Sequence, residues 1–547
     1  MAKYVFGIDL GTTYSCIAYV DETGRETVIK NKEGFPTTPS VVEFESPTQV
    51  VAGKVAKENA FISPQNVAML FKPLMGKSDY VGTYQGEDKS PEEVSSFVLR
   101  KLANDAGEIL GTEVKDVVIT CPAYFGTAER TATKNAGEIA GLNVLEVISE
   151  PTAAAIFYGF AKEQEEKTIL VYDLGGGTFD VTIMSISANK IEVICSEGNH
   201  ELGGKDWDEA AMRYLYDEFV AQTSFDGDFD ESDTQALRLK AESAKQHLTS
   251  RNETRVPVDA SGLRASIMLS RETFDQLTTM LLNQTLEKTD DAIAVAKEKG
   301  YDIDEILLVG GSTKMKQVSE ALINKYAMEP KVLDPDESVA KGAAIHAVNV
   351  YISNQQSLQE WDSKELGDQQ APPPQMNPDD YTEELAVAPT MFGIGGKSAA
   401  PEIVFATTKS YALEAIIEGE VKCCNMIIKN SPMPKGSVRV SRTFGTASPN
   451  QETAEIVVFE NDFPDEYFDV DEDYKLGDAS LELPGNLPAG SPIEIMFELN
   501  AEGILEIFGR DVTSGKEIRA TMKVKDNPMS AEKVEELKEK SKAIVVM

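Results

Sequence analysis

One pattern occurs twice in the first 190 residues of this chain, and it constrains the fold more than any other feature of the sequence. The segments VFGIDLGTTYSCIAYV (residues 5–20) and LVYDLGGGTFDVTIMS (residues 170–185) follow the same plan. Each has an apolar strand, then Asp-Leu-Gly, a turn of Gly and Thr, and a second apolar strand. A duplicated unit of this kind predicts two related lobes that face each other.

The turns of both units are suited to phosphate, because glycine lets the backbone approach an anion closely and point N–H groups at it. One such hairpin alone is as often an ordinary β-turn. Two hairpins, together with a third glycine loop in LLVGGSTKM (307–315), predict a site for ATP or ADP. The predicted nucleotide-binding residues are Gly11, Thr12, Thr13, Tyr14, Gly175, Gly176, Gly177, Thr178, Gly310, Gly311 and Ser312.

An aspartate ends the first strand of each unit. Asp9 and Asp173 are therefore placed to hold Mg²⁺, and we expect them to do so through its waters because this ion dehydrates reluctantly. Lys72 is a candidate for contact with the γ-phosphate, although a lone lysine is usually a surface charge. Glu150 precedes Pro151 at a helix start, where an acid also pairs with the helix dipole. Asp180 is a candidate to orient or deprotonate the attacking water.

Composition excludes some classes of partner. Among 547 residues there are 52 Lys and Arg against 91 Asp and Glu, a formal net charge of −39. This charge disfavours binding to nucleic acid or to a membrane surface. Five cysteines without a CxxC spacing and three scattered histidines predict neither a disulfide framework nor a metal cluster. With no signal peptide or apolar run long enough to span a bilayer, we expect a cytoplasmic protein.

The chain is expected to form two domains. Residues 1–351 alternate short apolar runs with helical stretches, which is typical of an α/β domain. Expected strands there are 4–10, 114–121, 169–173, 179–186 and 306–309, and expected helices are 128–140, 233–248 and 274–299.

The remaining residues change in character. Residues 352–402 are rich in Gln, Pro, Asp and Gly and predict a polar linker. Residues 403–526 alternate apolar and polar side chains, as in 493–499 and 519–524, with a hairpin turn at NAEG (500–503), and predict an all-β sandwich. Residues 527–547 predict a short helix, with Ser530 at its start and acidic residues in its first turns.

Several motifs together resemble the nucleotide-binding domain of the 70-kDa heat-shock chaperone family. They are GIDLGTTYSC, PAYFGTAERTATKNAGEIAGLNVLEVISEPTAAAIFYG, VYDLGGGTFDV, ELGGKDWD, LLVGGSTKM and DPDESVAKGAA. The resemblance implies an actin-like, two-lobed ATPase over residues 3 to about 350. By motif position it implies metal, phosphate or catalytic roles for Asp9, Lys72, Glu150, Asp173, Thr178 and Asp180, nucleotide contacts for Gly203, Gly204, Glu242, Lys245, Thr249 and Asp336, and a signalling role for Pro122 and Arg130.

The chain departs from this family in the adenine pocket, at its linker and at its C-terminal end. Gln246 and Lys314 stand where the family often has arginines that stack on the base, which predicts weaker or altered nucleotide affinity. Residues 403–405 match the interdomain segment that docks as an edge strand in the ATP-bound family fold. Phe444 and Ile456 match the family's peptide cleft, although both are equally suited to a plain sandwich core, and Ala454 predicts a wider pocket. The family normally continues into a helical lid, whereas this sequence stops after one short helix.

The leading hypothesis is an ATP-dependent chaperone in which hydrolysis controls the hold of the β-domain on unfolded or extended peptide segments. J-domain and nucleotide-exchange co-chaperones are then possible partners. The alternative is a divergent relative that binds nucleotide and acts as a regulator or scaffold for another chaperone. A sugar or glycerol kinase and an actin-like filament former share the two hairpins, but neither explains the appended β-sandwich.

Overall fold

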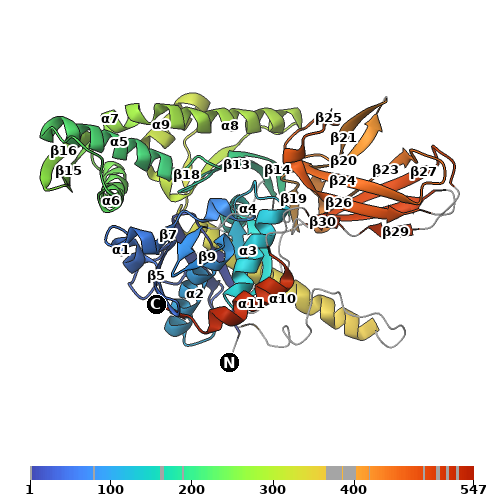
Figure 1. Cartoon of the computed structure of the whole chain (residues 1–547), viewed down its shortest axis with the longest axis horizontal. Coiled ribbons are helices and arrows are strands. Elements are labelled where there is room, and N and C mark those ends of the chain that lie inside the picture. Colours follow the sequence, from blue (N-terminus) through green and yellow to red (C-terminus); the bar gives the residue numbers. More distant parts are fainter. Residues whose placement is uncertain are drawn as a thin grey trace.

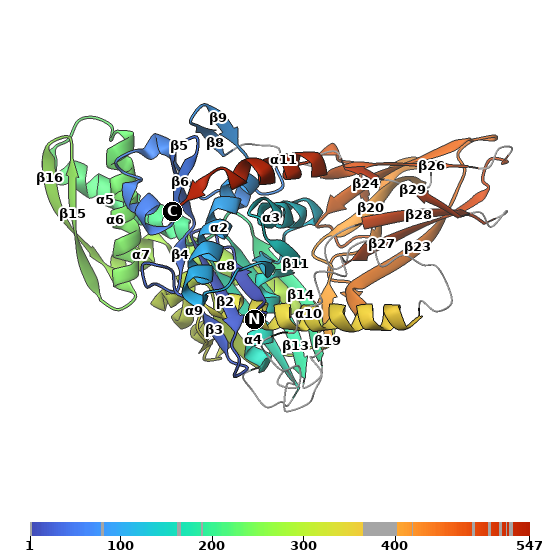
Figure 2. The ribbon, with the colours of Figure 1, turned by 90° about the horizontal axis from the view of Figure 1, so that it is seen from below.

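The computed structural model places an α/β part beside a β-sandwich, and a long helix, α10 (Ser338–Lys364), projects from the α/β part (Figures 1 and 2). This agrees with the predicted fold class. None of the helices that the structure describes is long and apolar enough to cross a membrane. The described residues are 3–77, 81–160, 166–187, 190–364, 385, 402–417, 419–483, 487–500, 505–512, 517–520, 522–524 and 529–547.

Lobe I, residues 3–160, is built on a mixed sheet that contains the first copy of the repeat. Its strands are β1 (Phe6–Asp9), β2 (Tyr14–Val20), β3 (Glu26–Val28), β4 (Thr38–Pro39), β10 (Asp116–Cys121) and β11 (Asn143–Ser149). The order is β11-β10-β1-β2-β3, and β4 pairs with β2. Strands β1 and β2 form an antiparallel hairpin, while β1 pairs with β10 in parallel.

Lobe II, residues 166–337, repeats this plan. Strands β12 (Lys167–Leu174) and β13 (Phe179–Ser187) form the second antiparallel hairpin, and β12 pairs in parallel with β17 (Glu305–Val309). The sheet also contains β14 (Lys190–Asn199) and β18 (Lys331–Val332). The predicted duplication is therefore confirmed in the pairing of the strands.

Helices cover both faces of the two sheets. Helix α4 (Glu150–Phe160) and helix α10 pack between the lobes, because their alanine-rich faces share one core with residues of both sheets. Gly7 permits this, since a Cβ there would lie 2.1 Å from the backbone nitrogen of Ala344 in α10. The other helices are α1 (Lys54–Asn59), α2 (Pro91–Leu110), α3 (Thr127–Ile139), α5 (Gly204–Thr223), α6 (Glu231–Leu248), α7 (Arg271–Leu277), α8 (Thr279–Glu298) and α9 (Lys316–Tyr326).

Two expectations about helices differ from the structure. The helix expected over 274–299 is divided at Thr278, whose hydroxyl bonds the carbonyl of Phe274 four residues earlier, a bond that bends helices. Helix α10 continues to Lys364 and so takes in the first residues of the predicted linker. The segment 352–364 contains no Pro or Gly, so nothing in it stops the helix. Apart from Leu385, the rest of that linker to residue 401 lies outside the described residues.

The sandwich has one sheet in the order β25-β21-β20-β24-β26-β30 and another in the order β23-β27-β28-β29. Arg519–Val524, expected as one strand, belongs to two strands in opposite sheets, and residue 521 between them is not described. The predicted NAEG turn lies almost wholly outside the described residues. The strands are β20 (Ser410–Ile417), β21 (Glu420–Ile427), β23 (Ser437–Gly445), β24 (Thr453–Asn461), β25 (Tyr467–Asp469), β26 (Lys475–Glu482), β27 (Pro492–Asn500), β28 (Leu505–Asp511), β29 (Glu517–Ala520) and β30 (Met522–Val524).

The proposed peptide-cleft residues contact the core of the sandwich. Ile456 is 2% exposed and belongs to that core, while Phe444 and Ala454 are partly buried against it. A structural role is therefore sufficient to explain Ile456.

The linker strand joins the two parts. Strand β19 (Glu402–Ala406) pairs in parallel with β14 at the edge of the lobe II sheet, and its other side pairs with β22 (Pro432–Met433) of the sandwich region. This position agrees with the docked edge strand that the family resemblance implies for residues 403–405.

The C-terminal segment, residues 529–547, lies on lobe I and not on the sandwich (Figure 2). Ser530 caps α11 (Ala531–Lys542) as expected, by accepting a hydrogen bond from the Lys533 N–H. Arg100 of α2 donates to the carbonyls of Ser541 and Ile544, and the Ile544 side chain enters the lobe I core. Strand β31 (Val545–Val546) then joins the small sheet β31-β6-β5-β7, which also holds β5 (Val41–Ser46), β6 (Gln49–Ala52) and β7 (Val67–Met69).

Candidate functional site

The two glycine hairpins meet between the lobes. A Cβ on Gly176 would lie 2.2 Å from Oγ1 of Thr13, and one on Gly177 would lie 2.5 Å from Cγ2 of Thr12. Only glycine permits contacts this close, so the composition of the second turn is explained by its packing on the first. The Gly-rich turns thus face each other across the mouth of one cleft.

This cleft has a volume of about 500 Å³, within the range of small-molecule sites. It brings together most of the predicted site residues from both lobes. Those that line it are Asp9, Gly11, Thr12, Thr13, Tyr14, Lys72, Glu150, Asp173, Gly175, Gly176, Thr178, Gly204, Glu242, Lys245, Gln246, Thr249, Gly310, Gly311, Ser312, Lys314 and Asp336.

Three predicted residues do not line the cleft. Gly177 and Gly203 lie behind it, where a Cβ on Gly203 would come within 2.5 Å of the Gly177 backbone. They hold the hairpin of residues 175–178 against the start of α5, and direct nucleotide contact stays a prediction for both. Asp180 is 1% exposed, and its carboxylate accepts hydrogen bonds from the backbone of Ala123 and Tyr124.

Acidic groups are concentrated at the inner end of the cleft. Burial, and then the charge of Glu150, raise the pKa values of Asp9, Asp173 and Asp180 above their usual range. Lys72 Nζ lies 2.5 Å from Oε1 of Glu150 and is 3% exposed. Burial lowers the pKa of Lys72, but Glu150 and Asp9 outweigh it, so that the amine stays charged.

These carboxylates fit a divalent cation. Oδ1 of Asp180 is buried without a hydrogen-bond partner in the described part of the chain, and one lysine does not balance the surrounding acids. Within the described residues, no group of three or more His, Cys, Asp and Glu side chains is close enough to bind a metal directly. Contact through water, which Mg²⁺ favours, is therefore the mode that the residues fit.

The outer end of the cleft is formed by α6 and the third glycine loop. Lys245 Nζ donates to the carbonyl of Gly204 and to Oδ2 of Asp208, both at 2.8 Å. Gln246 is exposed, and Lys314 forms an ion pair with Asp336. Neither side chain presents the guanidinium plane that would stack on a base.

A contact that no sequence pattern predicts closes the cleft. Lys57 Nζ of α1 lies 2.6 Å from Oε2 of Glu242 in lobe II and donates to the Tyr14 hydroxyl at 2.9 Å. Residues 57 and 242 are too far apart in the chain for any spacing rule to pair them. Asp208, which pairs with Lys245, was not predicted either, although it lies inside the ELGGKDWD motif.

A short loop connects the inner end of the cleft to the sandwich. Residues 123 and 124 bind the Asp180 carboxylate, and Thr127 three residues later contacts the hydroxyl of Tyr411 at 3.2 Å. The Thr127 N–H donates to Oε2 of Glu460 at 3.4 Å. The loop of residues 123–127 therefore contacts both the buried carboxylate of Asp180 and the sandwich.

The chain is similar to known proteins over most of its length. The family model described as "Hsp70 protein" matches residues 5–82, 79–360 and 365–546. A "Chaperone protein DnaK" of Thermotoga maritima is 37% identical over 524 residues, which cover 94% of this chain and 79% of that protein. Proteins of the same name from Thermosipho melanesiensis and Thermosipho africanus are each 36% identical over 523 residues, with the same coverage.

Proposed function

The chain belongs to the Hsp70 protein family and is an ATP-dependent molecular chaperone with ATPase activity; from this premise we propose how its own residues couple ATP to peptide binding. ATP bound in the cleft favours the arrangement in which β19 and the sandwich dock on the α/β part. Hydrolysis releases this docking and lets the sandwich hold unfolded or extended peptide segments more tightly. The observation that carries the proposal is the loop 122–127, which contacts Asp180 on one side and the sandwich on the other.

We assign the chemical roles by position in the cleft. Lys72, held by Glu150, contacts the γ-phosphate and offsets its charge. Glu150, Asp173 and Asp180 orient the attacking water and accept its proton, and the raised pKa values of Asp173 and Asp180 suit these two aspartates to this task. Asp9 and Asp173 would hold Mg²⁺ through its waters, and the ion would neutralise negative charge on the phosphates.

The remaining cleft residues bind the nucleotide. Backbone N–H groups of the two hairpins cradle the phosphates, while Glu242, Lys245 and Asp336 approach the adenosine. The contact between Lys57 and Glu242 joins the lobes over the bound nucleotide and so slows its release.

We propose a cytoplasmic location, with J-domain and nucleotide-exchange co-chaperones as partners. This proposal rests on the family to which the chain belongs.

The test is single-turnover ATP hydrolysis by the full chain, with and without an extended apolar peptide. Lys72→Ala serves as the blank, and Glu460→Gln tests the loop contact against Glu420→Gln, an exposed acid of the same sandwich. We expect peptide to accelerate hydrolysis in the wild type and the Glu420 variant, and to accelerate it less in the Glu460 variant. If peptide does not accelerate hydrolysis in the wild type or in either glutamate variant, coupling through this loop is refuted. If the chain binds ATP without hydrolysing it, the regulatory alternative is favoured.

A further inference from the structure

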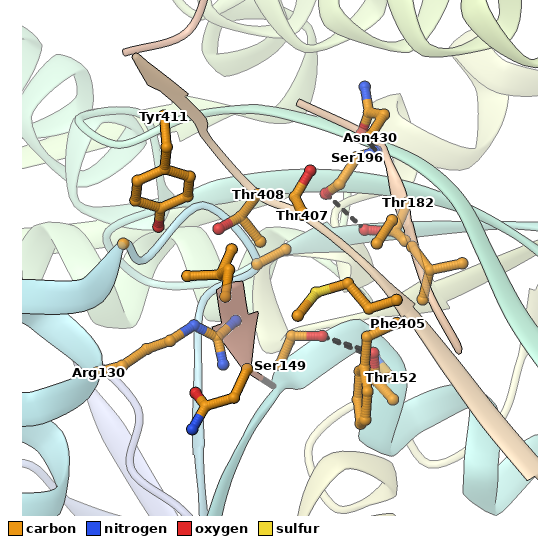
Figure 3. A pocket seen from close by; sticks show the side chains of 17 residues that line it. Arg130, Ser149, Thr152, Thr182, Ser196, Phe405, Thr407, Thr408, Tyr411 and Asn430 are labelled. Atoms are coloured by element: carbon orange, nitrogen blue, oxygen red, sulfur yellow. Dashed lines mark hydrogen bonds between the residues drawn. The ribbon is translucent and has the colours of Figure 1, made fainter. Parts of the chain in front are cut away.

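A second cavity lies where the α/β part, the linker strand and the sandwich meet (Figure 3). It shares no lining residue with the ATP cleft. Its volume of about 40 Å³ is roughly three times what one water requires, so a ligand of a few heavy atoms fits. The polar side chains that line it are Arg130, Ser149, Thr152, Thr182, Ser196, Thr407, Thr408, Tyr411, Asn430 and Asn500.

Arg130 is the unusual member of this lining. It is 8% exposed, and its guanidinium points into the space among the other side chains (Figure 3). Nε donates to the Phe125 carbonyl at 3.0 Å and one terminal nitrogen donates to the Val147 carbonyl at 3.3 Å. A guanidinium has five N–H donors, so three of them have no partner among the described residues.

The charge of Arg130 is also unpaired. No carboxylate oxygen of the described residues lies within 4.0 Å of its nitrogens. An arginine side chain keeps its proton and therefore its charge in proteins. Burying such a charge without a counter-ion costs free energy of folding. The cavity has no aspartate or glutamate in its lining, although the chain as a whole carries a net charge of −39.

The hydroxyl groups provide further donors. Oγ of Ser149 lies 2.6 Å from Oγ1 of Thr152, and Oγ1 of Thr182 lies 2.9 Å from Oγ of Ser196. Each pair needs only one of its two hydrogens for the bond between the hydroxyls, so the second remains to donate into the cavity. The lining thus combines one cation with several donors and matches an acceptor-rich anion.

We propose that this cavity binds one small tetrahedral oxyanion, for which inorganic phosphate is the probe. Arg130 holds two of its oxygens with parallel N–H bonds, and the hydroxyls reach the others. Because the lining comes from both domains and from the linker, the bound anion stabilises the docked arrangement. Glu460 bonds the neighbouring Thr127 N–H, and its charge limits the affinity without blocking the site.

The test uses the full chain saturated with Mg²⁺ and a non-hydrolysable ATP analogue, which fills the triphosphate position in the cleft. Calorimetric titration with phosphate, at constant ionic strength, then measures phosphate binding outside the ATP cleft. We expect one saturable site in the wild type, weakened roughly tenfold or more by Arg130→Gln, the loss expected for a charge-assisted hydrogen bond. Arg264→Gln, which changes an arginine that is 76% exposed on lobe II, should leave binding unchanged.

A second variant and a direct observation separate binding from folding defects. Thr408→Leu fills the cavity, keeps every charge, and should abolish phosphate binding. Crystals grown with selenate should show an anomalous peak within hydrogen-bond distance of Arg130. Absence of a saturable site, equal affinity in all variants, or only water at Arg130 would overturn the proposal.

Phosphate could come from solution or from the chain's own ATP hydrolysis, and a single turnover of ATP labelled in the γ-phosphate distinguishes the two. Label retained by the wild type but not by Arg130→Gln identifies product phosphate. Label lost equally from both, together with saturable binding of added phosphate, identifies phosphate from solution. If Arg130→Gln changes neither the affinity for added phosphate nor the retention of label, the site does not exist as proposed.

Discussion

Gly203→Ala tests whether the second phosphate hairpin is positioned by close backbone packing. The added methyl group would lie 2.5 Å from the backbone N and C atoms of Gly177, whereas ordinary contacts begin at 3.4 Å. The two segments must therefore separate by about 1 Å. This movement also stretches the hydrogen bonds from the Gly204 N–H to the Gly175 carbonyl and from the Lys205 N–H to the Gly176 carbonyl, now 2.9 and 2.8 Å long.

The expected effects follow from these distances. Loss of two backbone hydrogen bonds costs about 2 kcal/mol of stability at roughly 1 kcal/mol each. A displacement of about 1 Å at groups that position the γ-phosphate lowers the rate of the chemical step by about 100-fold. We therefore expect Gly203→Ala to fold, to bind nucleotide less tightly, and to hydrolyse ATP about 100-fold more slowly.

Single-turnover hydrolysis and chemical denaturation measure these two quantities separately. Gly227→Ala is the matched control, because a Cβ there meets only the flexible ring of Phe225, at 3.3 Å. A Gly203→Ala variant that hydrolyses ATP at the wild-type rate would refute the claim that this packing sets the hairpin's position.

Three further predictions concern other parts of the chain. Gln246→Arg combined with Lys314→Arg should tighten ADP binding several-fold in calorimetry, because each guanidinium stacked on the base contributes about 0.5–2 kcal/mol; unchanged affinity would contradict this. Ile544→Asp should release the C-terminal segment, since it places a charge in the lobe I core, and limited proteolysis should then cut after residue 528 faster than in an exposed Ile323→Asp control. Burial raises the pKa of Glu305, but hydrogen bonds from two lysines and Tyr158 outweigh it and lower the pKa to about 2, below the ordinary 4.5. Its contribution to stability, roughly 1–3 kcal/mol, is therefore complete above about pH 4.5 and is lost as the pH falls toward 2, so Glu305→Gln should flatten the acid limb of the denaturation profile.

The sequence predicted the parts of the molecule that depend on local pattern. The duplicated hairpins, the division into an α/β part and a sandwich, and the Ser530 cap each follow from residues close together in the chain. The sequence also predicted most of the residues that line the cleft between the lobes, because glycine turns and strand-end acids carry a clear signal.

The parts that could not be predicted depend on long-range packing. Nothing near Lys57 indicates that it meets Glu242, and nothing near Gly203 indicates that it packs against the backbone of Gly177. The cavity beside Arg130 is lined by residues of both lobes, the linker strand and the sandwich, which are far apart in the chain. Helix α10 extends further than its polar composition predicts, because glutamine and glutamate are good helix formers.

The pairing of β31 with β6 has a consequence for behaviour in solution. The N–H and carbonyl groups along β6 are occupied by the C-terminal segment, through bonds of 2.9–3.0 Å that involve Thr48, Val50 and Ala52. If this segment left, an open strand edge would lie beside the apolar hole vacated by Ile544, a combination that promotes aggregation. Residues 545–547 thus cover a surface of the chaperone that would otherwise promote aggregation. Conditions that release these residues should first cause self-association, which light scattering detects.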